Sequence, residues 1–484
     1  MATEARTQRQ VLFAFSAMML ATLLAALDQT IVATALPQIV SDLQGFEDLS
    51  WVVTAYLLAT TVTVPLYGKL SDLYGRRRLF VVAISIFLVG SALCGTAQSM
   101  GELIAFRALQ GVGAGGLLPL TQAAIADLFS PRERGKYQGY IGSMWATAAV
   151  AGPLLGGTLT DAASWRWIFF INVPLAAIAL VVVMRTMKPG GRTREHAIDW
   201  GGAALLSVGV SCILLASAWG GTTYAWDSPQ VIAAALVGVA GVLAFIWQER
   251  RASEPLLPLK LFRGRTFTVS SLAALGIGAV LFGITIYVPV FMQGVLQASA
   301  TSSGVVLIPL TLGWVVAAFV GGQLITRTGR YRVFPLIGAT LVLVGCLLLC
   351  LLDEQSSKVV ASADLVVIGV GMGLMFQVFV IATQNAVAMA DLGVATAAIQ
   401  FFRAMGASLA VAALGTLLTS RLPAGVDPNR LTSSAAQVPQ SARVALADAL
   451  HAVFVALVPL AALVLVLSFL LPELPLRTNT AADD

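Results

Sequence analysis

The stretch Gly68-Lys69-Leu70-Ser71-Asp72-Leu73-Tyr74-Gly75-Arg76-Arg77-Arg78 separates two apolar runs, at roughly 50–67 and 79–98. Each run is long enough to cross a bilayer, which takes about 20 residues. A connection this short and this charged does not lie in hydrocarbon, so we expect a tight loop at a membrane face. Its glycines allow a sharp turn and the close approach of another backbone. The plain alternative is that its arginines only orient the two helices.

The same pattern returns in the second half of the chain. Gly322-x-Leu324-x-Thr326-x-x-Gly329-Arg330 matches Gly68-x-Leu70-x-Asp72-x-x-Gly75-Arg76 position for position. A repeat of this length indicates two homologous halves that share one orientation. The second copy has Thr326 where the first has Asp72, so only the first loop is expected to carry an acid.

The composition predicts an all-α polytopic membrane protein. Of the 484 residues, 58% are hydrophobic and only 11% are charged, whereas soluble domains carry roughly 25% charged residues. Long apolar runs recur along the chain, and in lipid such runs are helical because their backbone groups must pair internally. The net charge of +5 comes from loop arginines and does not predict nucleic-acid binding. No phosphate-binding loop or metalloprotease motif occurs, so we expect no enzyme, cofactor or metal site.

Fourteen spans are expected. They lie at roughly 11–35, 50–68, 79–98, 102–127, 137–160, 166–187, 199–218, 230–248, 268–292, 302–325, 333–352, 362–388, 394–419 and 449–471. With the N-terminus inside, the inner segments hold 22 Lys and Arg and the outer loops hold 5. This bias predicts that both termini are cytoplasmic.

The position of the two homologous loops predicts an insertion between the halves. The loops follow the second and tenth spans, whereas two adjoining six-helix halves would place them six spans apart. We therefore expect a six-helix bundle over 1–190, an inserted helix pair over 191–262 and a second six-helix bundle over 263–484. Parallel repeats of this kind suit a transporter that rocks around a site between its halves.

Asp28 is the candidate proton site, because it interrupts the first span in Leu27-Asp28-Gln29-Thr30. An acid at membrane depth is costly and is by default functional, although a structural cap or ion pair is the alternative. At 1.5 Å per residue, Asp28 lies about 13 Å below the outer surface and Arg107 about 8 Å below it. The long Arg107 side chain spans the difference, so we expect a pair whose carboxylate takes up a proton when the two groups separate.

A second group of small residues lies in the fifth span, in Gly152-Pro153-Leu154-Leu155-Gly156-Gly157. Gly152 and Gly156 are four residues apart and share one helix face, and Pro153 removes a backbone donor and favours a kink. Gly406 follows Gly152 at the distance that separates the two loops, which supports the repeat. We expect close helix packing here, at a place where two bundles approach and swing.

Several motifs together resemble the major facilitator superfamily, and within it the fourteen-helix drug/proton antiporter family. They are Leu27-Asp28-Gln29-Thr30-Ile31-Val32 with Ala35-Leu36-Pro37, the loop from Gly68 to Arg78, Arg107 with Gln110-Gly111, the Gly152–Gly157 segment, and Trp165-Arg166-Trp167-Ile168-Phe169-Phe170-Ile171-Asn172-Val173-Pro174. The resemblance is dense over the N-terminal half and rests mainly on helix count and on the loop at 322–332 in the rest.

The resemblance implies roles for particular residues. Asp28 is implied in proton coupling with Arg107 as its partner. Gly68, Asp72, Gly75 and Arg76 are implied as an inner gate, and Gly152, Pro153, Gly156 and Gly157 as the antiporter helix. Ala33 and Thr34 depart from the family, whose members often have Asn near this position. We expect no acid in the spans of the second half, so a preference for dications is not expected.

The candidate substrate cavity lies between the halves. Its candidate lining residues are Trp145, Phe282, Tyr287, Phe291, Trp314, Phe376 and Arg403. The alternative for each aromatic residue is that it faces lipid. Arg403 lies about 14 Å into its span, and its alternatives are a structural ion pair or a side chain that snorkels to the membrane surface.

These observations favour a monomeric proton-driven exporter in the plasma membrane. Its expected substrates are hydrophobic or cationic amphipathic small molecules, and its expected partners are protons and the lipid bilayer. Three alternatives stay open: an exporter of a lipid or of one metabolite, an inward proton symporter, and a membrane sensor that does not transport.

Overall fold

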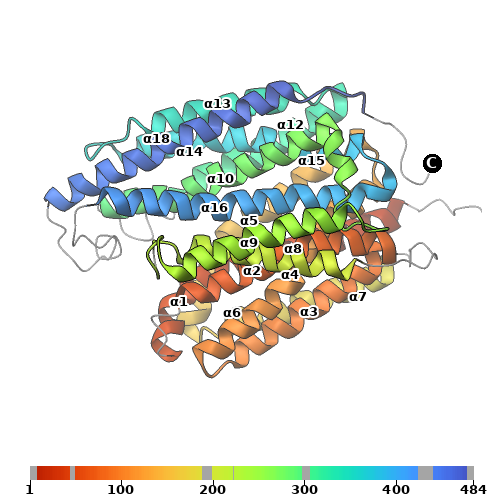
Figure 1. Cartoon of the computed structure of the whole chain (residues 1–484), viewed down its shortest axis with the longest axis horizontal. Helices are drawn as coiled ribbons and strands as arrows, with labels where there is room; N and C mark the ends of the chain where they lie inside the picture. The colour runs from red at the N-terminus through yellow and green to blue at the C-terminus, as the bar shows by residue number, and fades with distance from the viewer. Residues whose placement is uncertain are drawn as a thin grey trace, which may run out of the picture.

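The computed structural model describes residues 8–43, 49–187, 199–221, 223–296, 306–422 and 440–476. Over these ranges the chain is helical, and its only extended pairing is an isolated bridge between Gly220 and Tyr224. The helices run roughly side by side along one direction (Figure 1).

The helices coincide with the fourteen predicted spans. The first half holds α1 (Gln8–Leu43), α2 (Leu49–Tyr74), α3 (Arg76–Thr96), α4 (Met100–Leu128), α5 (Pro131–Ala162), and the short α6 (Trp167–Phe170) that leads into α7 (Asn172–Thr186). Next come α8 (Trp200–Trp219), α9 (Pro229–Glu249) and the 3-10 helix η2 (Leu259–Arg263). The second half holds α10 (Arg265–Gly294), α12 (Ile308–Thr328), α13 (Val333–Leu349), α14 (Lys358–Met375), α15 (Val378–Ala386), η3 (Met389–Asp391), α16 (Leu392–Arg421) and α18 (Gln440–Leu470).

Within the described residues, 12 helices are long and apolar enough to cross a membrane. They do not include α13, which has 17 residues, or α5, of which not every side chain is described. The prediction of an all-helical membrane protein is confirmed.

The two homologous loops have the same backbone geometry. Gly75 ends α2 with a φ of 88°, and Gly329 ends α12 with a φ of 69°. A side chain at this φ is strained, so each turn requires glycine where the chain reverses. The repeat seen in the sequence is therefore also a repeat in conformation.

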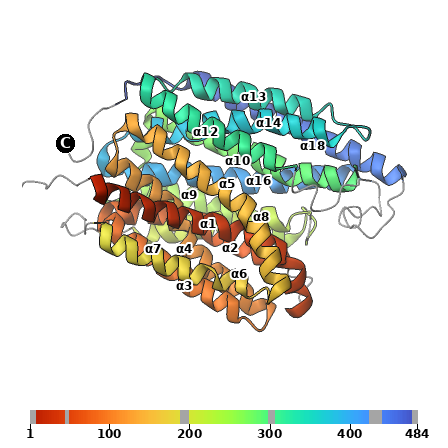
Figure 2. The same ribbon diagram turned by 180° about the vertical axis from the view of Figure 1, so that it is seen from behind.

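Each half has its own hydrophobic core. In the first half α1 packs on α5 and α7, and α4 packs on α2 and α3; in the second half α10 packs on α16 and α18, and α12 on α14. Figures 1 and 2 show the two halves as separate layers of helices. The halves meet chiefly where α5 crosses α12 and where α2 crosses α16.

The α8–α9 pair lies against the junction of the halves. α8 contacts both α2 and α16, whereas α9 packs on α8. The α9 surface away from α8 is apolar and open, with Leu236 65% exposed and Leu243 61% exposed. Such a surface is suited to contact with lipid. The division into bundles 1–190 and 263–484 with an insertion at 191–262 stays a prediction.

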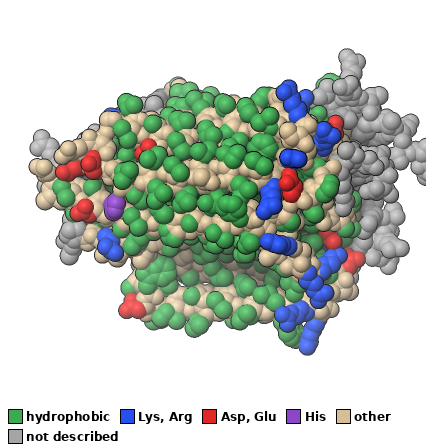
Figure 3. All heavy atoms as spheres, turned by 90° about the horizontal axis from the view of Figure 1, so that it is seen from above, with side chains coloured by type: hydrophobic (Ala, Val, Ile, Leu, Met, Phe, Trp, Pro, Cys, Tyr) green, Lys and Arg blue, Asp and Glu red, His purple; other side chains and the backbone are tan. Residues whose placement is uncertain are grey.

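Lys and Arg side chains gather at one end of the apolar surface (Figure 3). We call this the basic end, and it contains Arg76–Arg78, Arg132 and Arg327–Arg332. The start of α1 and the end of α18 lie at this same end (Figure 1). The distribution agrees with the loop charges read from the sequence.

Candidate functional site

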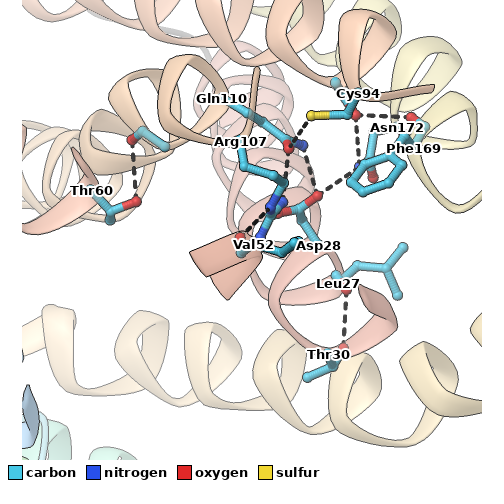
Figure 4. Close-up of polar contacts among 12 residues, drawn as sticks. Leu27, Asp28, Thr30, Val52, Thr60, Cys94, Arg107, Gln110, Phe169 and Asn172 are labelled. Atoms are coloured by element: carbon cyan, nitrogen blue, oxygen red, sulfur yellow. Dashed lines mark hydrogen bonds and ion pairs between the residues drawn. The ribbon is translucent and has the colours of Figure 1, made fainter. Parts of the chain in front are cut away.

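Asp28 and Arg107 form an ion pair inside the first half. Arg107 Nη1 lies 2.8 Å from Asp28 Oδ2. Asp28 is 0% exposed and Arg107 is 2% exposed. The helices α1 and α4 therefore bring together the two residues whose depths matched in the sequence (Figure 4).

Two amides complete the surroundings of the carboxylate. Gln110 Nε2 donates to Asp28 Oδ1 at 2.7 Å, and Asn172 Nδ2 donates to the same oxygen at 3.1 Å. Arg107 Nη1 also donates to Gln110 Oε1 at 2.8 Å. We call Asp28, Arg107, Gln110 and Asn172 the Asp28 network, and all four come from the first half (Figure 4).

Neighbouring helices hold the Asp28 network in place. Arg107 Nε donates to the carbonyl of Val52 at 3.2 Å, and its guanidinium lies 4.1 Å from the centre of the Tyr56 ring. Asn172 Nδ2 also donates to Ser91 Oγ at 3.1 Å. A buried ion pair is tolerated when further hydrogen bonds satisfy both groups, which is the case here.

Gln110 and Asn172 were quoted as parts of motifs, but neither was predicted to contact Asp28. Each is a polar residue in an apolar run, and this was the feature of the sequence that could have indicated a buried polar contact. Their contact with Asp28 depends on how α4 and α7 rotate about their axes, and the sequence alone does not fix that rotation.

Asp72 closes a contact between the halves at the basic end. Its carboxylate accepts hydrogen bonds from the backbone N–H groups of Gly393, at 3.1 Å, and Val394, at 2.9 Å. These N–H groups belong to the first turn of α16, where a helix carries unpaired donors and about half a positive charge. Arg76 holds the acid from the other side, with Nη1 at 2.6 Å from Asp72 Oδ1, and also pairs with Asp127 at 3.0 Å.

A second contact of opposite polarity lies at the repeat-related position. Arg132 Nε donates to the carbonyl of Thr326 at 2.9 Å, and its Nη2 donates to the carbonyl of Arg327 at 3.0 Å. These carbonyls end α12, where a helix carries partial negative charge. The second half thus lacks the acid of the first, and an arginine from the opposite half binds the helix end instead. Sequence reasoning missed this contact, because Arg132 was counted only as a topology charge.

Glycines let the halves touch at the basic end. A Cβ on Gly135 of α5 would come within 2.7 Å of the carbonyl oxygen of Gly322 in α12. A Cβ on Gly68 would come within 2.9 Å of the carbonyl oxygen of Gly393. Backbones this close leave no path between them, so these contacts hold the basic end closed in this conformation.

A layer of carboxamide groups lies deeper, where the halves also meet. Gln400 Nε2 of α16 donates to Gln122 Oε1 of α4. Gln384 Nε2 of α15 donates to Thr396 Oγ1 at 3.1 Å and to the Gln122 carbonyl at 3.3 Å. All four residues are buried. This layer, which we call the carboxamide floor, joins the two halves through buried polar side chains.

The Gly152–Gly157 segment lies in α5, which is continuous through it. Gly152 packs on α1, where an added Cβ would lie 2.7 Å from Thr30 Cβ. Gly156 is buried, whereas a Cβ on Gly157 would meet nothing within 4 Å. The side chain of Pro153 lies outside the described residues. The segment therefore joins α5 closely to α1 within one half.

The predicted cavity residues divide into two groups. Tyr287 donates to the carbonyl of Val411 at 2.9 Å, and Phe291, 1% exposed, packs edge-on against Phe454. Both lie in the core of the second half, and their place in a cavity wall stays a prediction. Trp145, Phe282, Trp314, Phe376 and Arg403 keep intermediate exposure.

One acid of the second half was overlooked. Asp364 is buried in α14, six residues from the start of that helix, and its Oδ2 has no partner among the described residues. The expectation that the second-half spans carry no acid is therefore wrong. The residue lies inside an apolar run and was visible in the sequence.

Comparison with known proteins identifies the family. Residues 18–202 and 200–411 match the family model described as Major Facilitator Superfamily. The chain belongs to the major facilitator superfamily. It is therefore a multi-pass membrane transporter.

Similar proteins come from bacteria and from fungi. An uncharacterized MFS-type transporter of Mycobacterium tuberculosis is 41% identical, over 97% of this chain and 71% of its own length. The multidrug transporter protein MdtP of Bacillus subtilis is 39% identical, over 87% of this chain and 77% of its own length. The structure of the proton:xylose symporter XylE superposes with a TM-score of 0.68 over 99% of both chains at 14% identity, which shows the shared fold.

Proposed function

We propose that this transporter exports amphipathic small molecules in exchange for protons by alternating access. The basic end faces the cytoplasm of a cell bounded by a plasma membrane, as the distribution of Lys and Arg favours. The conformation described is then closed toward the cytoplasm. The multidrug names of two Bacillus subtilis relatives support export of small molecules.

The Asp28 network carries the proposal. The carboxylate of Asp28 lies in α1, is fully buried, and shares one cluster with a fully buried arginine and two amides. A group with this setting binds a proton when its partners separate and releases it when they return. Movement of α1 against α4 during alternating access provides that separation.

Asp28→Asn tests proton coupling. The amide keeps the shape of the side chain but has no proton to release, so uphill efflux driven by a pH gradient is expected to fall to the background rate. The measurement is dye efflux in proteoliposomes with an imposed gradient, repeated with a protonophore. Wild-type efflux by Asp28→Asn with unchanged pH dependence contradicts the proposal.

Asp42→Asn is the matched control. Asp42 lies on the same helix and accepts a hydrogen bond from Trp165 Nε1 at 2.9 Å, outside the Asp28 network. The same chemical change there is expected to leave gradient-driven efflux intact. Equal loss in both variants would assign the effect to α1 in general and not to the network.

A further inference from the structure

We propose that Arg403 forms an anion-binding subsite in the space between the halves, and that the transported molecules are amphipathic organic anions. The subsite consists of Arg403, Phe376 and Trp314, and it rests on the proposed function for its role in export. It replaces the expectation of cationic substrates. The observations that carry it are the direction Arg403 faces, its lack of a counter-charge and its aromatic neighbours.

The position of Arg403 on α16 turns it toward the other half. Thr396, Gln400 and Arg403 follow the spacing of one helix face. Gln400 donates to Gln122 of the first half, and Thr396 accepts from the Gln384 amide that also reaches the backbone of Gln122. Arg403 lies one turn beyond Gln400 on the side away from the basic end, so it stands directly above the carboxamide floor.

No counter-charge within the described residues neutralises Arg403. It makes no ion pair or hydrogen bond with any of them, although it lies in the middle of a membrane-spanning helix. The carboxylate of Asp28 is already bound on both oxygens by three donors of its own half. A cation at this depth is costly without a partner, so the site favours a ligand that brings negative charge.

Aromatic rings complete the subsite. The guanidinium of Arg403 lies 4.5 Å from the centre of the Phe376 ring, and that ring lies 4.8 Å from the ring of Trp314. Trp314 Nε1 is buried and has no acceptor among the described residues. Phe376 holds the guanidinium through a cation–π contact, which leaves the N–H groups at its edge available to an acceptor.

These features define the class of ligand. A planar guanidinium binds a carboxylate, sulfonate or phosphate group with two parallel hydrogen bonds. The rings of Phe376 and Trp314 suit an apolar or aromatic body attached to that group. A small inorganic anion would use the charge but not the rings, so an amphipathic monoanion fits better.

Two dyes with one xanthene core test the charge preference. Fluorescein is anionic and rhodamine 6G is cationic at neutral pH, and each binds to the full-length transporter in nanodiscs in a fluorescence-polarisation assay. Without a pH gradient this assay does not depend on proton coupling, so its failure is distinct from failure of the proposed function. We expect the wild type to bind fluorescein more tightly than rhodamine 6G.

Arg403→Gln is expected to weaken fluorescein binding about tenfold and to leave rhodamine 6G binding unchanged. Arg403→Lys keeps the charge and is expected to lose less affinity for fluorescein. If the Gln variant shows no melting transition and is therefore unfolded, the Lys variant is the one that tests the inference. Arg251→Gln is the matched control, because Arg251 stacks on Trp247 at 4.0 Å but is exposed beyond α9. It is expected to change neither affinity.

Three results would overturn the inference. The wild type binding only rhodamine 6G excludes an anion site. Arg403→Gln weakening both dyes equally, or neither, makes Arg403 a structural residue. The third result is displacement of fluorescein by chloride but not by gluconate at the same ionic strength. It would show that the site binds a small inorganic anion and not an amphipathic one.

Discussion

At the scale of single residues, Asp28 shows how completely a membrane acid is satisfied within its own half. Its two oxygens accept from Arg107, Gln110 and Asn172. The sequence predicted the Asp28–Arg107 pair, because helix rise alone gives depth. It did not predict Asn172, because a contact between α1 and α7 depends on side-chain packing that depth does not describe.

Gly152 gives a prediction at the same scale. Gly152→Ala places a methyl group against Thr30, 2.7 Å from its Cβ and closer still to its hydroxyl oxygen. Overpacking of this kind costs about 1–3 kcal/mol, so we expect a lower melting temperature in detergent.

Gly157→Ala is the control, because its added Cβ meets nothing within 4 Å. It is expected to melt like the wild type. Equal melting temperatures for all three proteins would show that α5 and α1 adjust freely, and that Gly152 is not needed for their packing.

At the scale of helices, the two halves are joined by two helix-end contacts of opposite sign. Asp72 binds the N-terminus of α16, and Arg132 binds the C-terminus of α12. The loop pattern in the sequence favours the first contact, because the acid lies at the end of one span and a later span begins at the same membrane face. The second contact could not be predicted, because the absence of an acid at position 326 does not indicate which residue binds the helix end instead.

Asp72→Asn and Arg132→Gln are expected to open the basic end independently. Each contact contributes about 0.3–1 kcal/mol if exposed and about 2 kcal/mol if partly buried. A cysteine introduced at the buried Ala395 of α16 is then expected to react several-fold faster with an impermeant thiol reagent. The double variant is expected to show the product of the two effects.

Thr326→Ala is the control for both charge changes. It removes a hydroxyl that, among the described residues, bonds to the carbonyl of Gly322 one turn back in its own helix, and it keeps the carbonyl that Arg132 binds. Reactivity at position 395 is expected to stay at the wild-type level. Unchanged reactivity in the Asp72 and Arg132 variants, with transport lost, would mean that these residues do not act as latches.

At the scale of the whole molecule, the two halves approach closely where α5 crosses α12. Gly135→Ala places a Cβ 2.7 Å from the Gly322 carbonyl oxygen. Because both atoms are fixed to the backbone, no change of side-chain rotamer relieves this clash. The halves must separate there, so we expect the basic end to open. Distance measurements between spin labels on the two halves at this end check the result.

Gly142→Ala on the same face of α5 is the control. Its Cβ would lie 3.7 Å from Ala318 Cβ, an ordinary contact. Label distances are expected to match the wild type. A wild-type distance distribution for Gly135→Ala would show that the crossing tolerates a methyl group and does not set the closed state.

The whole fold was more predictable than its central space. Long apolar runs and a repeated loop predict fourteen helices in two halves, because hydrocarbon leaves the backbone no alternative to helix. The cavity lining was less predictable, because one aromatic residue suits lipid, core or cavity equally. Phe291 lies inside the core of the second half, whereas Phe376 packs against that core and contacts Arg403, and only packing separates the two cases.

The unpaired charge of Arg403 has a consequence for energetics. If the cargo is a monoanion exchanged for one entering proton, each cycle moves two positive charges inward in net terms. A membrane potential that is negative inside then drives the cycle with about 2.3 kcal/mol per charge at 100 mV. A monocation exchanged one for one would move no net charge and gain nothing from voltage. If Arg403 selects anionic cargo as proposed, a one-for-one exchange with protons is therefore electrogenic.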